Sequence, residues 1–261
     1  MIHESAVIHE GAEIGDGVEI GPFCVVGPQV RLADGVKLHS HVVVEGRTVI
    51  GEKTRIFPFA SIGHEPQDLK FAGEDTRLEV GARNTIREYV TMNPGTEGGG
   101  GLTRVGDGNL FMMGVHVGHD CMIGNGCVLA NYASLGGHSI IEDQVVIGAL
   151  AGVHQFCRIG QGAMIGGLAA VAADVIPYGS VVGERAHLAG LNLVGLKRRG
   201  APREEMHQLR HLMEKLFSGD GTVKSRAEAL RGEFANTQQS LQVIDFILAE
   251  TDRHLTTPQT R

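Results

Sequence analysis

The chain of 261 residues has no tryptophan, few other aromatic residues and no long hydrophobic run. An aromatic content of 5% is typical of a core built from repeated small and aliphatic side chains. No apolar segment approaches the roughly 18 residues of a membrane-spanning helix. No basic segment followed by an apolar run marks a signal peptide either. We therefore expect a cytoplasmic protein without membrane insertion.

What the sequence does contain is a period of six residues through its first two-thirds. The 26 hexads almost all open with an aliphatic anchor, and a small residue commonly stands four positions later. Hexad repeats are typical of parallel β-helix solenoids. The pattern breaks near residues 64–79 and 93–104. The anchors are Ile2, Ile8, Ile14, Ile20, Val26, Leu32, Leu38, Val44, Ile50, Ile56, Ile62, Val80, Ile86, Met92, Val105, Phe111, Val117, Ile123, Leu129, Leu135, Ile141, Ile147, Val153, Ile159, Ile165 and Val171.

Anchor and small residue can both point inward only if the chain turns a corner in each hexad. Three hexads then close a triangular coil, and coils stack at about 4.8 Å. Each buried aliphatic side chain would contribute about 1.5–3 kcal/mol. The four cysteines, Cys24, Cys121, Cys127 and Cys157, all occupy the small inward position. They are therefore predicted to be core thiols rather than metal ligands or disulfides.

Beyond Pro177 the hexads fade and helical periodicity begins. We assign residues 1–190 to the β-helix and 191–261 to a small α-helical C-terminal domain. Amphipathic segments are expected at about 222–235 and 238–251, and the Thr- and Pro-rich end is expected to fray.

The first helix of this tail is expected to begin near Pro202 and to end at Gly219 and Gly221. Its apolar residues recur at spacings of three and four, which is the helical period. They are Met206, Leu209, Leu212, Met213, Leu216 and Phe217.

Charge is divided unevenly along the chain. Residues 191–261 carry 11 Lys and Arg against 9 Asp and Glu, whereas residues 1–190 carry 12 against 21. A basic run from Lys197 to Arg210 is either a solvated helix face or a surface for an anionic partner, such as a phosphate or an acidic protein. The glycine run Gly98–Gly101 lacks the ending of a phosphate-binding loop, so it is interpreted as a flexible loop.

A group of outward histidines is the strongest functional signal. His119, Gly137 and Gln155 occupy the same position in successive coils, with His116 and His138 nearby. A neutral imidazole could act as a general base. Alternatively, His116, His119 and His138 could hold zinc, or the cluster could be plain surface. Asp120 could orient His119 only if the chain turned a corner between them.

Several segments together resemble the UDP-N-acetylglucosamine O-acyltransferases, which catalyse the first step of lipid A biosynthesis. The resemblance covers the chain in order and is carried by Gln67–Lys70 (QDLK), Val115–Cys121 (VHVGHDC), Gly136–His138 (GGH), His154–Cys157 (HQFC) and Gly195–Gly200 (GLKRRG). It implies a left-handed coil and a homotrimer with active sites between prisms. It also implies transfer of a 3-hydroxyacyl group from acyl carrier protein to the sugar nucleotide, without cofactor or metal and without a nucleic-acid partner.

The same resemblance implies roles for individual residues. His119 would be the general base, Asp120 its orienting partner, and the Gly137 N–H the oxyanion donor. Gly167 and Arg185 would shape the acyl-chain groove. Substrate contacts would come from Gln67, Asp68, Lys70, His116, His138, Gln155, Asn192, Arg198 and Arg199.

Three positions depart from the family pattern. Asn93 and Arg185 stand where histidine is common, and Val194 stands where glutamate is common, so sugar contacts and acyl-chain length are left open. Whether the acceptor carries a 3-hydroxyl or a 3-amino group is open as well. The alternatives are the later N-acyltransferase of the same pathway, a hexapeptide-type zinc carbonic anhydrase and a non-catalytic scaffold.

Overall fold

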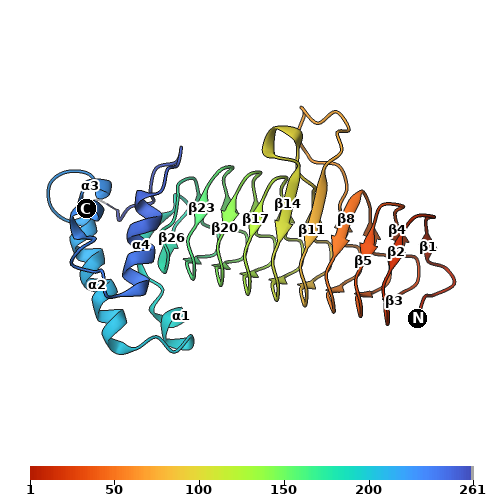
Figure 1. The fold of residues 1–261 in the computed structure, drawn as a ribbon, viewed down its shortest axis with the longest axis horizontal. Helices are drawn as coiled ribbons and strands as arrows, with labels where there is room; N and C mark the ends of the chain where they lie inside the picture. Colours follow the sequence, from red (N-terminus) through yellow and green to blue (C-terminus); the bar gives the residue numbers. More distant parts are fainter. Residues whose placement is uncertain (260–261) are drawn as a thin grey trace.

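The computed structural model describes residues 1–259 and consists of a triangular prism of stacked coils followed by a group of helices (Figure 1). The N-terminus lies at one end of the prism, and the helices lie at the other end. No helix among residues 1–259 has the length and apolar character needed to cross a membrane.

Three sheets form the three faces of the prism. The nine-stranded sheet consists of β1 (Val7–Ile8), β4 (Val25–Val26), β7 (Val43–Val44), β10 (Ser61–Ile62), β13 (Thr91–Met92), β16 (His116–Val117), β19 (Ser134–Leu135), β22 (Gly152–Val153) and β25 (Ala170–Val171). The eight-stranded sheet consists of β2 (Glu13–Ile14), β5 (Arg31–Leu32), β8 (Arg47–Ile50), β11 (Arg77–Val80), β14 (Leu102–Val105), β17 (Met122–Ile123), β20 (Ile140–Ile141) and β23 (Arg158–Ile159). The ten-stranded sheet consists of β3 (Glu19–Ile20), β6 (Lys37–Leu38), β9 (Arg55–Ile56), β12 (Thr85–Ile86), β15 (Leu110–Phe111), β18 (Val128–Leu129), β21 (Val146–Ile147), β24 (Met164–Ile165), β26 (Gly179–Val182) and β27 (His187–Leu191).

The strand register confirms the period predicted from the sequence. Val7 pairs with Val25 in a parallel ladder, which is one coil of 18 residues. The offset grows to 30 between Ser61 and Thr91 and to 25 between Thr91 and His116, because loops are inserted there. The final pair, β26 with β27, is antiparallel.

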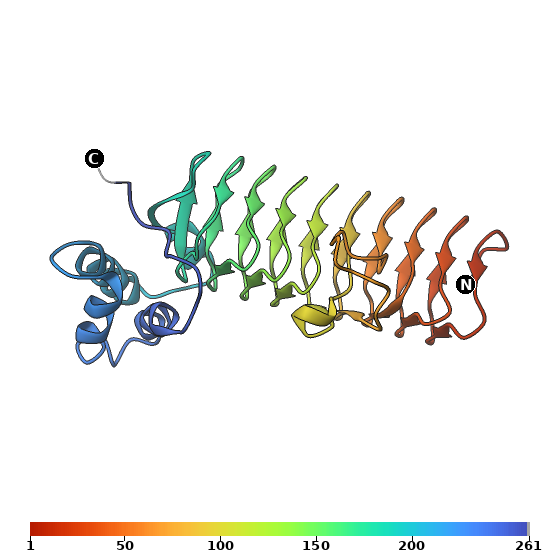
Figure 2. The same ribbon diagram turned by 90° about the horizontal axis from the view of Figure 1, so that it is seen from above.

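The two loops are shorter than the predicted breaks and lie beside each other (Figure 2). The first ends where β11 begins at Arg77, and the second ends where β14 begins at Leu102. The second contains the 3₁₀ helix η1 (Glu97–Gly99). Residues at the ends of the predicted breaks pair as strands: Arg77 is in register with Arg47 of the coil before it, and Leu102 is in register with Arg77.

The interior is filled by the hexad anchors and small residues, as expected. All four cysteines are free and buried. Burial raises the pKa of Cys121 to about 12 and the pKa values of Cys127 and Cys157 to about 11, because a thiolate would lose its hydration there.

We therefore expect none of the four cysteines to react with iodoacetamide at pH 8 in the folded protein. The thiolate is the reactive form, and burial both suppresses it and blocks access. Intact-mass measurement should show no adduct in the native protein and four adducts after denaturation. A native cysteine alkylated within minutes would contradict this assignment.

Four helices follow the prism: α1 (Leu193–Arg198), α2 (Arg203–Phe217), α3 (Val223–Leu230) and α4 (Gln238–Leu248). The helix predicted after Pro202 is confirmed, and Met206, Leu209, Leu212 and Leu216 are buried on its apolar face. The short α1 was not predicted, because its six residues are fewer than two turns.

The expectation that the C-terminal segment frays is wrong for residues 254–257; Thr260 and Arg261 lie outside the described residues. Asp174 N–H donates to His254 O, and Thr256 N–H donates back to Asp174 O. The Leu188 N–H donates to Thr257 O. The segment therefore pairs with the last coil, which propensity alone could not indicate.

Candidate active site

His119 and Asp120 stand at a corner of the prism just after β16. Asp120 adopts φ 59°, so the chain turns between the two residues and brings their side chains together. His119 Nδ1 lies 2.8 Å from Asp120 Oδ2. The corner between His119 and Asp120 that their pairing requires is therefore present.

Asp120 is buried, at 4% exposed, and its carboxylate is surrounded by donors. The Thr96 N–H donates to Oδ1 at 2.9 Å, and the Thr96 hydroxyl donates to Oδ2 at 2.6 Å. The Asp120 N–H in turn donates to Thr103 Oγ1 at 2.7 Å. Because these contacts suit a carboxylate acceptor, we assign the His119 ring proton to Nδ1, which leaves Nε2 as the free acceptor.

The glycine-rich loop packs against Asp120 of this pair, a contact that the prediction of a flexible loop did not include. A Cβ on Gly99 would lie 2.1 Å from Asp120 Cγ, and a Cβ on Gly95 would lie 2.8 Å from Asp120 Oδ1. Only glycine, which has no Cβ, lets the loop backbone come this close to the Asp120 carboxylate. His119 is 8% exposed although it is not on an inward position.

Gly137 lies one coil further along, directly against the His119 ring. The His138 N–H donates to His119 O, which fixes this register. A Cβ on Gly137 would stand 2.5 Å from both His119 Cε1 and Nε2. Within residues 1–259 the Gly137 N–H donates no hydrogen bond. A free acceptor nitrogen and a free backbone donor therefore meet at one place.

Replacing Gly137 by alanine should lower kcat/KM by at least about 100-fold, the scale of misplacing a positioned acid–base group. The added methyl group overlaps the His119 ring and must displace it. The acyl-transfer rate of the purified variant measures this effect. Gly232→Ala is the matched control, since Gly232 is exposed in the helical region and a Cβ there meets nothing within 4 Å. Equal losses in the two variants would contradict the contact between residue 137 and the His119 ring.

His116 and His138 flank the pair. His116 Nδ1 lies 2.8 Å from Thr91 Oγ1. The His138 ring stacks on Phe156 with centroids 4.3 Å apart and meets His119 edge-on at 5.0 Å. Burial lowers the pKa of His116 and of His138, because the charged imidazolium would lose hydration.

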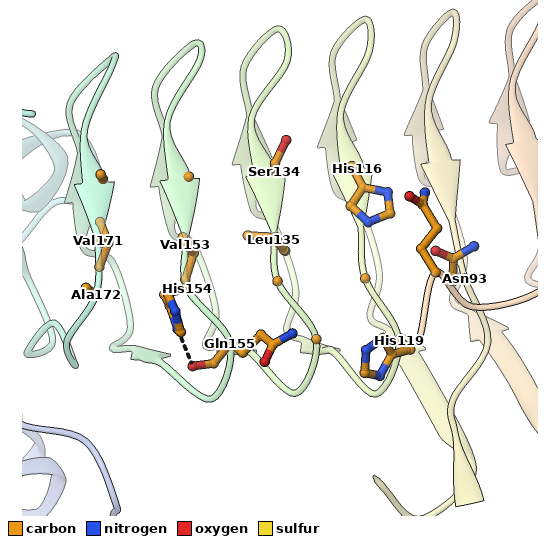
Figure 3. Close-up of a pocket in the computed structure, with 16 residues that line it drawn as sticks. Asn93, His116, His119, Ser134, Leu135, Val153, His154, Gln155, Val171 and Ala172 are labelled. Carbon is orange, nitrogen blue, oxygen red and sulfur yellow. Dashed lines mark hydrogen bonds between the residues drawn. The ribbon is translucent and has the colours of Figure 1, made fainter. Parts of the chain in front are cut away.

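A groove of about 500 Å³ runs along the nine-stranded face from this cluster (Figure 3). The predicted column of His119, Gly137 and Gln155 lines it together, with Gln67 and His116. Beyond Gln155 the lining is apolar and small: Gly152, Val153, Ala170, Val171 and Ala172. The groove thus joins a polar end to an apolar end.

Other predicted contacts lie around a second cavity on the loop side. Asp68, Lys70 and His138 line a cavity of about 430 Å³ with Phe156. This cavity adjoins the groove through the contact between the His138 and His119 rings.

The other residues predicted to contact substrate lie elsewhere. Asn192, Arg198 and Arg199 line a cavity of about 640 Å³ with Val194, beside β21, β24 and β26 of the ten-stranded sheet. One chain therefore does not bring them to His119. Gly167 and Arg185 line none of these three cavities.

Asn93 is buried at the polar end of the groove. Its Nδ2 donates to the carbonyls of His64 and Glu65 at 3.0 and 3.1 Å. Through these two hydrogen bonds Asn93 holds the first loop against the groove.

The predicted zinc trio is not the group that the structure assembles. Among residues 1–259 the potential metal cluster is His119, Asp120 and His138, with ligand atoms within 4.8 Å of one another. His116 lies outside it. His119 Nδ1 and Asp120 Oδ2 already bond to each other, so this donor set favours an acid–base pair over an open metal site.

Sequence reasoning missed Thr96, Thr103 and Arg253. Thr96 lies in the glycine-rich loop and Arg253 in the segment expected to fray. The Arg253 guanidinium donates to Gln155 O at 2.7 Å and contacts His154 Nδ1 at 3.0 Å. No spacing in the sequence indicates these contacts, since they join residues about a hundred positions apart.

Two family models match the chain. Residues 174–256 match the second domain of UDP-N-acetylglucosamine O-acyltransferase, and residues 11–46 and 102–137 match the bacterial transferase hexapeptide. A UDP-N-acetylglucosamine O-acyltransferase from Agrobacterium fabrum is 46% identical over 98% of this chain and 95% of its own. The enzyme of the same name from Paracoccus denitrificans is 61% identical over 78% and 77%.

A solved structure of a relative has the same fold as this chain. The Francisella novicida UDP-N-acetylglucosamine acyltransferase aligns with a TM-score of 0.96 at 37% identity, over all of this chain and 95% of the other. The prism is accordingly a left-handed parallel β-helix with a helical C-terminal region, as the resemblance implied. The chain therefore belongs to the UDP-N-acetylglucosamine O-acyltransferase family.

Proposed function

We propose that this acyltransferase moves a 3-hydroxyacyl group from the thioester of acyl carrier protein to the 3-hydroxyl of UDP-N-acetylglucosamine, as the first step of lipid A biosynthesis. The names of its relatives support the substrates. The observation that carries the chemistry is the free His119 Nε2 held against Gly137 by Asp120. Residence in the cytoplasm stays a prediction from the sequence.

The mechanism follows from these atoms. His119 Nε2 accepts the proton of the sugar 3-hydroxyl as its oxygen attacks the thioester carbonyl carbon. The carbonyl oxygen gains negative charge and accepts a hydrogen bond from the Gly137 N–H. Asp120 stabilises the imidazolium formed. The tetrahedral intermediate then expels the thiolate, which takes the proton from His119 and leaves as the carrier thiol.

Completing the site requires a second copy of the chain. The catalytic groove lies on the nine-stranded face, whereas Asn192, Arg198 and Arg199 lie beside the ten-stranded face. In a threefold arrangement about the edge shared by these two faces, each catalytic face meets the basic face of the next subunit. A homotrimer therefore forms three clefts, each with both sets of residues.

The shared edge has the chemistry of a buried interface. Its residues recur once per coil, adopt positive φ and expose large apolar side chains: Phe23, Phe59, Tyr89, Tyr132, Leu150 and Leu168. His41 stacks between Phe23 and Phe59 with ring centroids 4.9 and 5.0 Å away. A contiguous apolar ridge of this length marks an interaction surface.

The basic segment around Arg198 suits both the substrate phosphates and the acidic carrier protein. Arginine matches phosphate oxygens through its planar set of donors. Since such attraction is screened by salt, binding of the carrier should weaken as ionic strength rises.

Product analysis tests the proposed function directly. Purified protein should acylate UDP-N-acetylglucosamine from a mixed pool of acyl carrier thioesters, and tandem mass spectrometry should locate the ester at the 3-oxygen. The masses also report the acyl chain length, which the groove does not fix. Absence of any acylated sugar nucleotide, with donor thioesters intact, would refute the proposal.

A further inference from the structure

The C-terminal segment reaches back to the catalytic groove and holds Arg253 against it. Anchors flank this residue on both sides: the Thr251 hydroxyl donates to Asp174 Oδ2 at 3.0 Å, and Thr256 N–H donates to Asp174 O at 2.8 Å. No carboxylate among residues 1–259 lies within 4.0 Å of the Arg253 guanidinium. Its close partners are the neutral groups Gln155 O and His154 Nδ1.

This contact determines which nitrogen of His154 carries the proton. A guanidinium has only donors and stays charged, so His154 Nδ1 is the acceptor in this contact. The same Nδ1 lies 3.3 Å from Gln155 O, where it would have to donate. The Arg253 contact is shorter and charged, and Gln155 O already accepts from Arg253, so the acceptor role of Nδ1 prevails. The proton of the neutral ring then resides on Nε2, which makes Nε2–H a fixed donor. His154 lines the groove between Gln155 and the apolar end formed by Val171 and Ala172 (Figure 3).

We propose that Arg253 is a positioning residue that holds His154 in its Nε2–H form, so that this N–H binds an acceptor oxygen, a carbonyl or a hydroxyl, of the acyl donor. The inference rests on the proposed function. The apolar lining beyond Gln155 offers few other donors, so one N–H there sets the position of the donor chain. Arg253 also fixes the Gln155 peptide, one coil from Gly137.

Arg253→Met should raise KM for the acyl thioester about tenfold, while kcat and KM for the sugar nucleotide stay within about twofold, because a binding contact is lost. Arg253→Lys should retain most of the wild-type KM, since an ammonium also only donates. The matched control is Arg31→Met, which removes an exposed arginine on the eight-stranded face. In a His154→Ala background, Arg253→Met should add less than about twofold.

Nitrogen-15 spectra of the histidine rings give a readout that needs no substrate. His154, identified by its loss in His154→Ala, should show an unprotonated Nδ1 in the wild type and in Arg253→Lys, and a changed tautomer ratio in Arg253→Met. An unchanged tautomer in Arg253→Met overturns the inference, as does a fall in kcat with KM unchanged. A wild type that forms no product would refute the proposed function instead, and the spectra would still decide the role of Arg253.

Discussion

Replacing His119 by alanine should lower kcat/KM for acyl transfer by about 10³-fold while the prism stays folded. General-base catalysis by a positioned histidine typically contributes 10²–10⁴-fold, and His119 is the histidine whose ring lies directly against Gly137. The loss should appear in kcat, because the proton transfer occurs only in the transition state. Steady-state assays with the purified variant measure it.

His9→Ala is the matched control for that experiment, since His9 is exposed on an early coil far from the groove. It should keep wild-type kcat. Asp120→Asn should also lose activity, because an amide can present its N–H to His119 and favour the wrong tautomer. Full activity in His119→Ala would remove the chemical basis of the proposed mechanism.

Placing charges on the apolar edge should separate the subunits and abolish activity. In Phe59→Glu combined with Leu150→Glu, each trimer would gather six carboxylates around the threefold axis, unpaired and dehydrated, at a cost of several kcal/mol per buried charge. We expect monomers by light scattering and a fall in activity of more than about 100-fold. Circular dichroism should show the β-helix intact, since both side chains are exposed in the single chain.

Val49→Glu is the control for the edge variant. Val49 belongs to β8 on the eight-stranded face, which the proposed arrangement leaves outside the clefts, and it is also exposed. This variant should remain trimeric and active. Monomers that retain full activity in the edge variant would mean that one chain suffices for catalysis.

The fold was largely predictable because every coil repeats the same hexad pattern of an inward anchor and an inward small residue. An anchor such as Ile20 or Leu129 must point inward wherever its hexad lies, so the 18-residue register follows from counting alone. The same counting placed His119, Gly137 and Gln155 on one groove. The helix after Pro202 was predictable from its apolar spacing.

The rest of the site depends on segments that lie outside the hexad repeat. Thr96 reaches Asp120 only because an inserted loop folds over a corner, and glycine periodicity carries no information about that path. Arg253 contacts Gln155 from the C-terminal segment, whose Thr- and Pro-rich composition is typical of disordered chains. Asn192 and Arg198 lie on another face, and it is the proposed trimer that would bring them to the His119 of a second subunit.

Mixed trimers test the central claim, a catalytic histidine and phosphate-binding arginines contributed by different subunits. His119→Ala chains and Arg198→Ala/Arg199→Ala chains, each inactive alone, are co-expressed with different tags and hybrids are purified. Every hybrid trimer, whichever chain is present twice, has one cleft in three that combines an intact histidine face with an intact arginine face, so activity should return to about a third of wild type. Hybrids as inactive as their parents would contradict the account.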